Sequence, residues 1–182
     1  MMINWHEARI NLLKINDAYE RRFMFTSLLT ETVNAEPPPV IVGGHAVELY
    51  TMSAYSTSDI DLVIQDKVPF ERVLAEWGFK KEGRVWWDSE LGIAIDLIAV
   101  DIQRGQEQVV PIRIHDFSAY VLRIEEIIID RLAAYVHWQS QEDCDWAKFM
   151  LLTHLNEIDI NYIKQRAQEE GVLPVLNTML EE

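Results

Sequence analysis

The sequence predicts an α+β fold, in which a small mixed β-sheet is flanked by helices and followed by a C-terminal helical region. Helical periodicity near the N-terminus changes to short apolar strand segments from residue 40 onward. From Ile124 to the end, the pattern is helical again. The 182 residues, of which 49% are hydrophobic, suffice to bury a core in one or two small domains.

The N-terminal segment is predicted to be helical. Its apolar residues recur every three or four positions and form one amphipathic stripe, made of Trp5, Ala8, Leu12, Ile15, Tyr19 and Phe23. The helix is expected to end near the three consecutive prolines at 37–39, because proline cannot continue a helix. We therefore predict that residues 1–36 form a helical segment packed on the core.

Residues 37–120 are predicted to form the α+β core. Short apolar runs predict strands at residues 40–42, 60–64, 85–87, 93–100 and 109–114. Helices are expected at 45–52 and at 69–77, where Pro69 stands near the first turn. We expect a boundary within 117–123, so that residues 121–182 form the helical region, with breaks near Gln139, Asn156 and Gly171.

Composition and charge exclude several classes of protein. The apolar runs at 91–100 and 127–136 contain charged residues, and neither reaches the roughly 18–20 residues that a membrane span needs. The N-terminus lacks the pattern of a secretory signal, so a cytoplasmic location is expected. Cys144 is the single cysteine, which excludes an internal disulfide and a cysteine metal cage. The net charge of −14 disfavours duplex nucleic acid but is compatible with a Mg²⁺-bound nucleotide or a basic partner protein.

Two aspartates in the strand at 60–64 carry the first functional signal. Asp59 and Asp61 are two residues apart, so on a strand they point to the same face, while the apolar residues between and after them point to the other. Two like charges on one face repel each other, and a divalent cation relieves the repulsion. Mg²⁺ favours carboxylate oxygens as ligands. The alternative is that Asp59 caps a turn and that the other carboxylates are partly exposed.

Asp96 is a third candidate metal ligand, within the apolar strand at 93–100. A buried charge needs a partner. If this strand lies beside the strand at 60–64, Asp96 joins Asp59 and Asp61 in a site for one or two metal ions. Two metals roughly 3.5–4 Å apart would stabilise both the attacking and the leaving oxygen of a phosphoryl displacement.

Gly43 and Gly44 follow a short apolar strand and precede a predicted helix. Glycine lets the backbone approach a phosphate closely, and the N-terminus of a helix favours anions. The alternative is an ordinary turn from strand to helix. His45 is as compatible with a polar residue at a helix start as with a ligand contact.

Together these residues resemble the nucleotidyltransferase superfamily with the polymerase-beta-like palm. Its members carry a Gly-Gly or Gly-Ser turn, an acidic-x-acidic strand and a third acid on a later strand, and residues 43–44, 59–61 and 96 stand in those places. The polar run at 56–58 resembles the one that often precedes the acidic pair. Residues 126–134 and 142–146 resemble the helical half of small bacterial nucleotidyltransferases of the abortive-infection and toxin–antitoxin kind. This chain has His45 where the family often has Ser or Thr, and it has no Arg or Lys between Gly44 and Asp59.

The resemblance implies a Mg²⁺-dependent enzyme, with Mn²⁺ as a substitute, that moves a nucleoside monophosphate from a nucleoside triphosphate to an acceptor hydroxyl. Its implied catalytic residues and metal ligands are Asp59, Asp61 and Asp96. Its implied nucleotide-binding residues are Gly43, Gly44, His45, Ser58 and Arg131.

Residues in the helical region leave alternatives open. Arg131 lies on an apolar helical stripe and needs an acceptor, which a bound triphosphate, Asp143 or Glu126 would supply. Asp143 is expected to be an N-cap in preference to a general base. The pair at 86–87, Trp-Trp, would pack a hairpin or stack on a base.

Two further functions remain compatible with the sequence. The chain could be a binding module with this fold and little or no turnover, such as an antitoxin that neutralises a partner protein. It could also be an aminoglycoside-type enzyme, because an acid-rich surface suits a cationic small-molecule acceptor.

Overall fold

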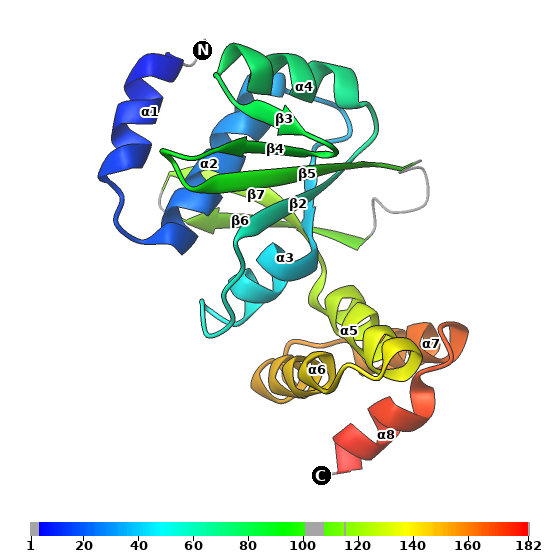
Figure 1. Ribbon diagram of the computed structural model, residues 1–182. Helices are drawn as coiled ribbons and strands as arrows, with labels where there is room; N and C mark the ends of the chain where they lie inside the picture. The colour runs from blue at the N-terminus through cyan, green and yellow to red at the C-terminus, as the bar shows by residue number, and fades with distance from the viewer. Residues whose placement is uncertain (1–3, 101–107, 115, 182) are drawn as a thin grey trace.

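The computed structural model describes residues 4–100, 108–114 and 116–181 of the 182-residue chain. The described strands form one mixed sheet in the order β3-β4-β5-β2-β1-β7-β6 (Figure 1). They are β1 (Val40–Val42), β2 (Asp59–Ile64), β3 (Lys80–Glu82), β4 (Val85–Asp88), β5 (Ile93–Ala99), β6 (Val109–Ile114) and β7 (Phe117–Leu122). The central strand β2 is antiparallel to β1 and parallel to β5.

The helices of the described residues are distributed before, within and after the sheet. They are α1 (Trp5–Lys14), α2 (Ala18–Val33), α3 (Gly43–Tyr50), α4 (Lys67–Glu76), α5 (Ile124–Trp138), α6 (Gln141–Thr153), α7 (Ile160–Glu169) and α8 (Leu173–Glu181). Side chains of Asp17, Ser140 and Asp159 accept hydrogen bonds from backbone N–H groups in the first turns of α2, α6 and α7. Within the described ranges, no helix combines the length and the apolarity that a membrane span requires.

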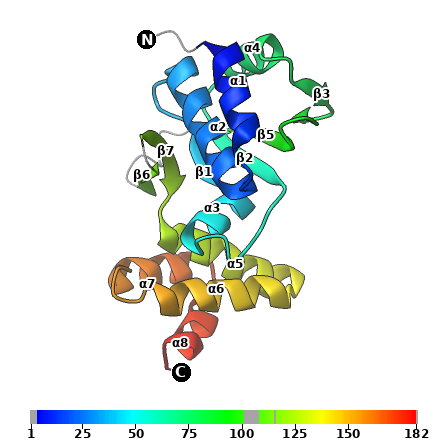
Figure 2. The same cartoon turned by 90° about the vertical axis from the view of Figure 1, so that its left-hand side faces the viewer.

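One face of the sheet is covered by helices and forms the core. On β2, Ile60, Leu62 and Ile64 point to this face and are at most 1% exposed. Helix α1 is joined to it by the stacked rings of Trp5 and Trp77, whose centroids lie 4.1 Å apart. Figures 1 and 2 show α1, α2 and α4 on this side. Because side chains alternate along a strand, the residues between the buried ones point to the opposite, open face.

The C-terminal helices lie beyond the end of the sheet, next to α3, as both views show (Figures 1 and 2). Helix α3 is one link between these helices and the sheet. The Tyr50 hydroxyl at the end of α3 donates a hydrogen bond of 2.8 Å to the carbonyl of Leu122, and Nε2 of His154 lies 2.8 Å from the carbonyl oxygen of Tyr50. The end of α3 is thus fastened both to β7 and to the end of α6.

The predicted fold class is confirmed, and most elements lie where the sequence places them. The predicted helical breaks near Gln139, Asn156 and Gly171 match the gaps between α5, α6, α7 and α8. The prediction of one continuous N-terminal helix is wrong. Residues 15–17 separate α1 from α2, and Asp17 caps the second helix. The apolar spacing continues across the interruption, so periodicity alone did not reveal it.

Two strands were not predicted. The short strand β3 is exposed and carries no apolar residue, and it exists through its pairing with β4. Strand β7 runs through the segment where the boundary was expected, and it ends at Leu122, beyond residue 120. It pairs in parallel with β1, far away in the sequence, which a local pattern cannot reveal.

Candidate functional site

The two glycines are the first residues of α3 and make a close turn where the chain leaves β1. Gly43 has φ +59°, a conformation that disfavours residues with a Cβ. A Cβ at this position would lie 2.2 Å from Oδ2 of Asp61, inside van der Waals contact. The backbone N–H of Gly44 donates a hydrogen bond to the Asp61 carboxylate. The turn therefore touches the acidic strand directly, and only glycine at residue 43 permits that approach.

The three predicted carboxylates share the open face of the sheet. Asp59 and Asp61 alternate with buried residues on β2, as predicted. Strand β5 lies beside β2 in parallel, and its register places Asp61 opposite Asp96. The three carboxylates differ in solvent exposure. Asp59 is exposed, Asp61 is half-buried and Asp96 is 5% exposed. The expectation that the strand at 93–100 lies beside the strand at 60–64 is therefore confirmed.

The electrostatics of this acidic face are unbalanced. Burial is the largest cause that raises the pKa of Asp61, and the nearby charges of Asp59 and Asp96 raise that pKa further. The Gly44 N–H and the Arg84 guanidinium lower it, but the sum remains a raised pKa. A cation placed among these carboxylates would remove the repulsion.

Each of the outer carboxylates has one neighbour that partly compensates it. The Thr57 hydroxyl donates a hydrogen bond of 2.7 Å to Oδ1 of Asp59. The Arg84 guanidinium pairs with Asp96 at 2.9 Å between Nε and Oδ2. Sequence reasoning missed Arg84, because its approach to Asp96 depends on the hairpin of β3 and β4 folding back beside β5.

The donor chemistry of the acidic face fits a hard divalent cation. All three side chains offer carboxylate oxygens, which Mg²⁺ and Mn²⁺ accept, and the raised pKa of Asp61 records a charge that a cation would stabilise. As the side chains stand, the described residues contain no group of three or more His, Cys, Asp and Glu gathered for a metal ion. The pairing of Asp96 with Arg84 is one physical reason, because it directs a carboxylate oxygen at the guanidinium.

His45 lies in the first turn of α3, next to the two glycines. Its side chain is completely buried beneath the turn, with Nδ1 at 3.2 Å from Oε2 of Glu48, so it does not face the open side of the sheet. Burial lowers the pKa of His45. Among the described residues, its Nε2 has no hydrogen-bond partner. The placement supports neither a nucleotide contact of this side chain nor a solvated residue at the helix start.

Ser58 is exposed directly before β2, on the segment that leads to the acidic pair. The hydroxyl that contacts Asp59 belongs to its neighbour Thr57. Thr57 also lies against the glycine turn, since a Cβ on Gly44 would approach its Oγ1 to 2.9 Å. The polar run before the acidic strand thus folds over the turn.

Arg131 connects the helical region to the same neighbourhood. Its Nη1 donates a hydrogen bond of 2.8 Å to Oδ1 of Asp143, which is one of the internal partners that the sequence left open. Its buried Nε has no partner within the described part of the chain. The Arg131 charge acts on the hydroxyl of Tyr55, which in turn lies 3.4 Å from a Cβ built on Gly44. Arg131 is therefore within electrostatic range of Tyr55, which lies beside the turn.

The structure also settles the surroundings of Asp143 and Trp86. Asp143 lies within the first turn of α6, and the N-cap is Ser140, whose hydroxyl accepts from the Asp143 N–H. The cap that we expected at Asp143 is thus wrong by three positions. Trp86 is 7% exposed, and the ammonium of Lys81 lies 5.5 Å from its ring centroid, which is the hairpin packing that the sequence left open.

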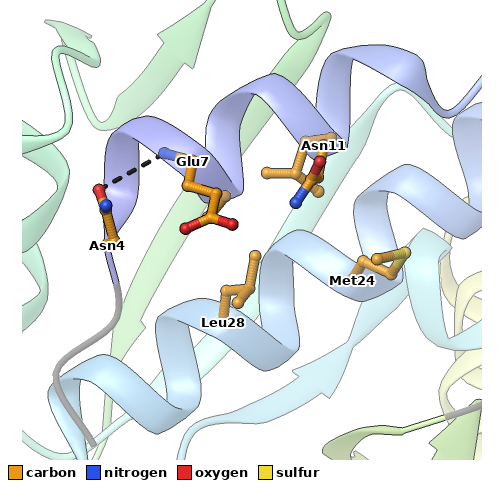
Figure 3. A pocket seen from close by; sticks show the side chains of 7 residues that line it. Asn4, Glu7, Asn11, Met24 and Leu28 are labelled. Atoms are coloured by element: carbon orange, nitrogen blue, oxygen red, sulfur yellow. Dashed lines mark hydrogen bonds between the residues drawn. The ribbon is translucent and has the colours of Figure 1, made fainter.

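A separate hollow lies between α1 and α2, with a volume of about 240 Å³. Figure 3 shows Asn4, Glu7 and Asn11 at its rim, with Leu28 and Met24 beneath. Both helices belong to the covered side of the sheet, so this hollow is remote from the acidic face. It offers no cluster of catalytic groups.

Comparisons with known proteins bear on the fold. No family model matches the sequence, and no curated protein matches it. Among solved structures, the chain is similar to an antigenic nucleotidyltransferase-like protein from Paracoccidioides brasiliensis, with a TM-score of 0.55 and 15% identity over 86% of this chain and 90% of that one. This chain has a nucleotidyltransferase-like fold.

The likeness at 15% identity concerns the nucleotidyltransferase-like fold and leaves the chemistry to the residues themselves. The fold brings together the glycine turn, the acidic strand and the third acid, whose sequence pattern had indicated a common site. It adds Arg84 and Thr57 to that site and places His45 behind it.

Proposed function

We propose that this protein is a Mg²⁺-dependent nucleotidyltransferase, which moves a nucleoside monophosphate from a nucleoside triphosphate to an acceptor hydroxyl. The observation that carries the proposal is the acidic face, where Asp61 contacts the glycine turn and stands opposite Asp96 in the sheet. Such a group of carboxylates beside a backbone N–H turn suits a triphosphate that arrives with its metal.

Each residue has a role that follows from its position. Asp59 and Asp61 would hold Mg²⁺, or Mn²⁺ in its place, which supplies neutralisation of the phosphate charges when bound. The turn of Gly43 and Gly44 lets phosphate oxygens approach the backbone. Asp96 would complete a second metal site and help to activate the acceptor hydroxyl, which loses its proton to this carboxylate as the hydroxyl oxygen bonds to the α-phosphorus and pyrophosphate leaves. Arg131, whose buried Nε has no hydrogen-bond partner among the described residues, would bind a phosphate oxygen from the helical edge of the site.

The test is thermal unfolding of the full chain with ATP, GTP, CTP or UTP, each with and without Mg²⁺. A ligand at 100 times its dissociation constant adds about 2.7 kcal/mol to the stability of the folded state. We expect a Mg²⁺-dependent shift with at least one triphosphate and its loss in the Asp59→Asn/Asp61→Asn double variant. Release of pyrophosphate upon addition of candidate acceptors then measures turnover.

The matched control is the Glu31→Gln/Glu76→Gln double variant, which makes the same change in charge at exposed residues of α2 and α4. It should keep the shift of the parent. The absence of a shift with all four triphosphates, in a protein that unfolds cooperatively, would contradict the proposed enzyme.

A catalytically weak binding module is the second candidate, and a specific observation favours it. Asp96 is engaged by Arg84, and the described residues hold no gathered group of three metal ligands. The net charge of −14 suits a basic partner protein, as for an antitoxin, or a cationic acceptor of the aminoglycoside type. Nucleotide binding without release of pyrophosphate from the triphosphate, whichever acceptor is added, would favour the module.

A further inference from the structure

Arg84 is placed at the acidic face by a tight turn between β3 and β4. Gly83 has φ +61°, which lets the chain reverse in two residues. The next residue after Arg84 is Val85, which pairs with Asp96 of β5. The turn therefore brings the Arg84 side chain to the third carboxylate, where Nε lies 2.9 Å from Oδ2.

The two partners of this ion pair differ greatly in exposure. The Asp96 side chain is 7% exposed, whereas the Arg84 side chain is 81% exposed. Asp96 is held within a paired strand, so the carboxylate stays in place. Arg84 stands in the solvent at the end of a hairpin, and it can leave Asp96 without breaking any packed contact of the core.

The Arg84 charge reaches beyond Asp96. It also lowers the pKa of Asp61, so the guanidinium lies within electrostatic range of two carboxylates of the site. The chain has no Arg or Lys between Gly44 and Asp59 that could meet a triphosphate there. A guanidinium presents planar N–H donors that match phosphate oxygens as well as carboxylates. Arg84 is thus a cation near the site with two kinds of acceptor available.

Metal binding and the Arg84 ion pair compete for the same group. An oxygen of Asp96 that accepts from the guanidinium offers less to a cation, and two positive charges around one carboxylate repel each other. When a metal ion takes Asp96, the exposed Arg84 guanidinium is free to bind another anion. The phosphates of a bound nucleotide would offer one at the same site.

We propose that Arg84 exchanges partners in the working site. It pairs with Asp96 in the empty protein, yields Asp96 to the metal, and binds a phosphate oxygen of the nucleoside triphosphate. This inference rests on the proposed function, since it assigns a phosphate-binding residue to the same site. In this exchange the Arg84 side chain links the binding of the metal ion to the recognition of the triphosphate.

The exchange predicts effects of opposite sign for one substitution. In Arg84→Ala, Mn²⁺ alone should bind more tightly, by about two- to fivefold, because the competing ion pair is gone. Inorganic tripolyphosphate with Mg²⁺ should bind more weakly, by roughly tenfold, because a charge-assisted contact is lost. A variant that merely folds poorly would lose affinity for both probes.

The experiment measures Mn²⁺ binding by electron paramagnetic resonance of the free ion, and tripolyphosphate binding by calorimetry, on the full chain. Arg84→Lys should retain part of the tripolyphosphate affinity, because it keeps the charge without the planar donors. Arg72→Ala removes an exposed arginine from α4 and should leave both affinities unchanged.

A second background separates the ion pair from a general effect of charge. In Asp96→Asn, the substitution Arg84→Ala should no longer tighten Mn²⁺ binding, because the pair no longer exists. If Arg84→Ala still tightens Mn²⁺ binding in the Asp96→Asn background, the arginine acts only through its long-range charge, and the proposed exchange of partners is wrong. Unchanged or weaker Mn²⁺ binding in the single Arg84→Ala variant also overturns it, as does unchanged affinity for tripolyphosphate.

The failure of the proposed function has a different signature. In that case the parent chain itself would bind neither Mn²⁺ nor Mg²⁺-tripolyphosphate, and the partner exchange would fall with it. A parent that binds both probes, combined with an indifferent Arg84→Ala variant, would overturn the exchange alone and leave the proposed function standing.

Discussion

Two groups of charged side chains lie on opposite sides of the glycine turn, and they are built differently. Beneath α3, Arg22, His45 and Glu48 are at most 5% exposed, and both oxygens of Glu48 accept hydrogen bonds from Arg22. On the open face, the exposed Arg84 pairs with Asp96 and lowers the pKa of Asp61, while Asp59 accepts a hydrogen bond from Thr57. In the first group the charges of Arg22 and Glu48 compensate each other, whereas the second group carries an excess of negative charge that a ligand could neutralise.

The pKa shifts express the same difference. Burial works to raise the pKa of Glu48, but the hydrogen bonds from His45 and Arg22 outweigh it and hold that pKa below its usual value. For Asp61, burial and two like charges act together, and its pKa is raised. Removing one partner of a compensated buried pair is costly, whereas an under-compensated carboxylate is a candidate place for a cationic ligand.

The largest expected effect comes from disrupting the group beneath α3. Glu48→Gln leaves the buried Arg22 without a counter-charge, which should destabilise the protein by about 3–5 kcal/mol. The measurement is urea unfolding at pH 7, with the exposed Glu31→Gln on α2 as the control that should change little. A loss below about 1 kcal/mol would contradict the view that this group is a structural unit.

The next effect is at the turn between the two groups. Gly43→Ala should destabilise the protein by about 1–2 kcal/mol, because a residue with a Cβ disfavours the left-handed conformation of residue 43. The new Cβ would also collide with the Asp61 carboxylate. Metal-dependent stabilisation by the nucleotide should disappear.

Gly171→Ala is the matched control for this turn. Gly171 has φ +74° with no atom within 4 Å of the added Cβ, so Ala there should cost only the backbone term and leave binding intact. Equal effects of the two substitutions on stability and on binding would remove the special role of residue 43.

The pH dependence of the group beneath α3 is a smaller effect. Burial lowers the pKa of His45, so in acid the unfolded chain takes up a proton that the folded state resists. The parent should lose stability as the pH falls below about 6.5, by at most ~1.4 kcal/mol per pH unit from this group. In His45→Gln that slope should be flatter, which urea unfolding at pH 7.5, 6.5 and 5.5 measures. The same slope in both proteins would argue against a buried neutral imidazole.

The smallest expected effect is at the open face. Asp61→Asn removes a like-charge repulsion and keeps an acceptor for the Gly44 N–H, so in EDTA at pH 7 it should stabilise the protein by about 0.5–1 kcal/mol. Because the folded-state pKa of Asp61 is raised, protonation favours the folded parent, and the difference should vanish as the pH falls through that pKa. A destabilised variant at pH 7 would mean that Asp61 is part of a structural network instead.

Local pattern was sufficient for the parts of the site that lie close together in the chain. The glycine pair after a strand and the alternation around Asp59 and Asp61 depend only on neighbouring residues, and both stand as predicted. The neighbouring strand of Asp96 was inferred because a buried charge needs a partner. His45 was misjudged, since whether the first turn of a helix faces solvent or the interior depends on α2 packing against it.

The sequence by itself determined the fold class, most of the elements and the spacing of the acidic residues, because alternation and helical periodicity follow from the geometry of a single strand or helix. Only the tertiary structure decided that Arg84 meets Asp96, that Arg22 and Glu48 enclose His45, and that β7 lies beside β1. These contacts join segments from different parts of the chain. They depend on pairing register and on which faces are buried together, and no local pattern encodes them.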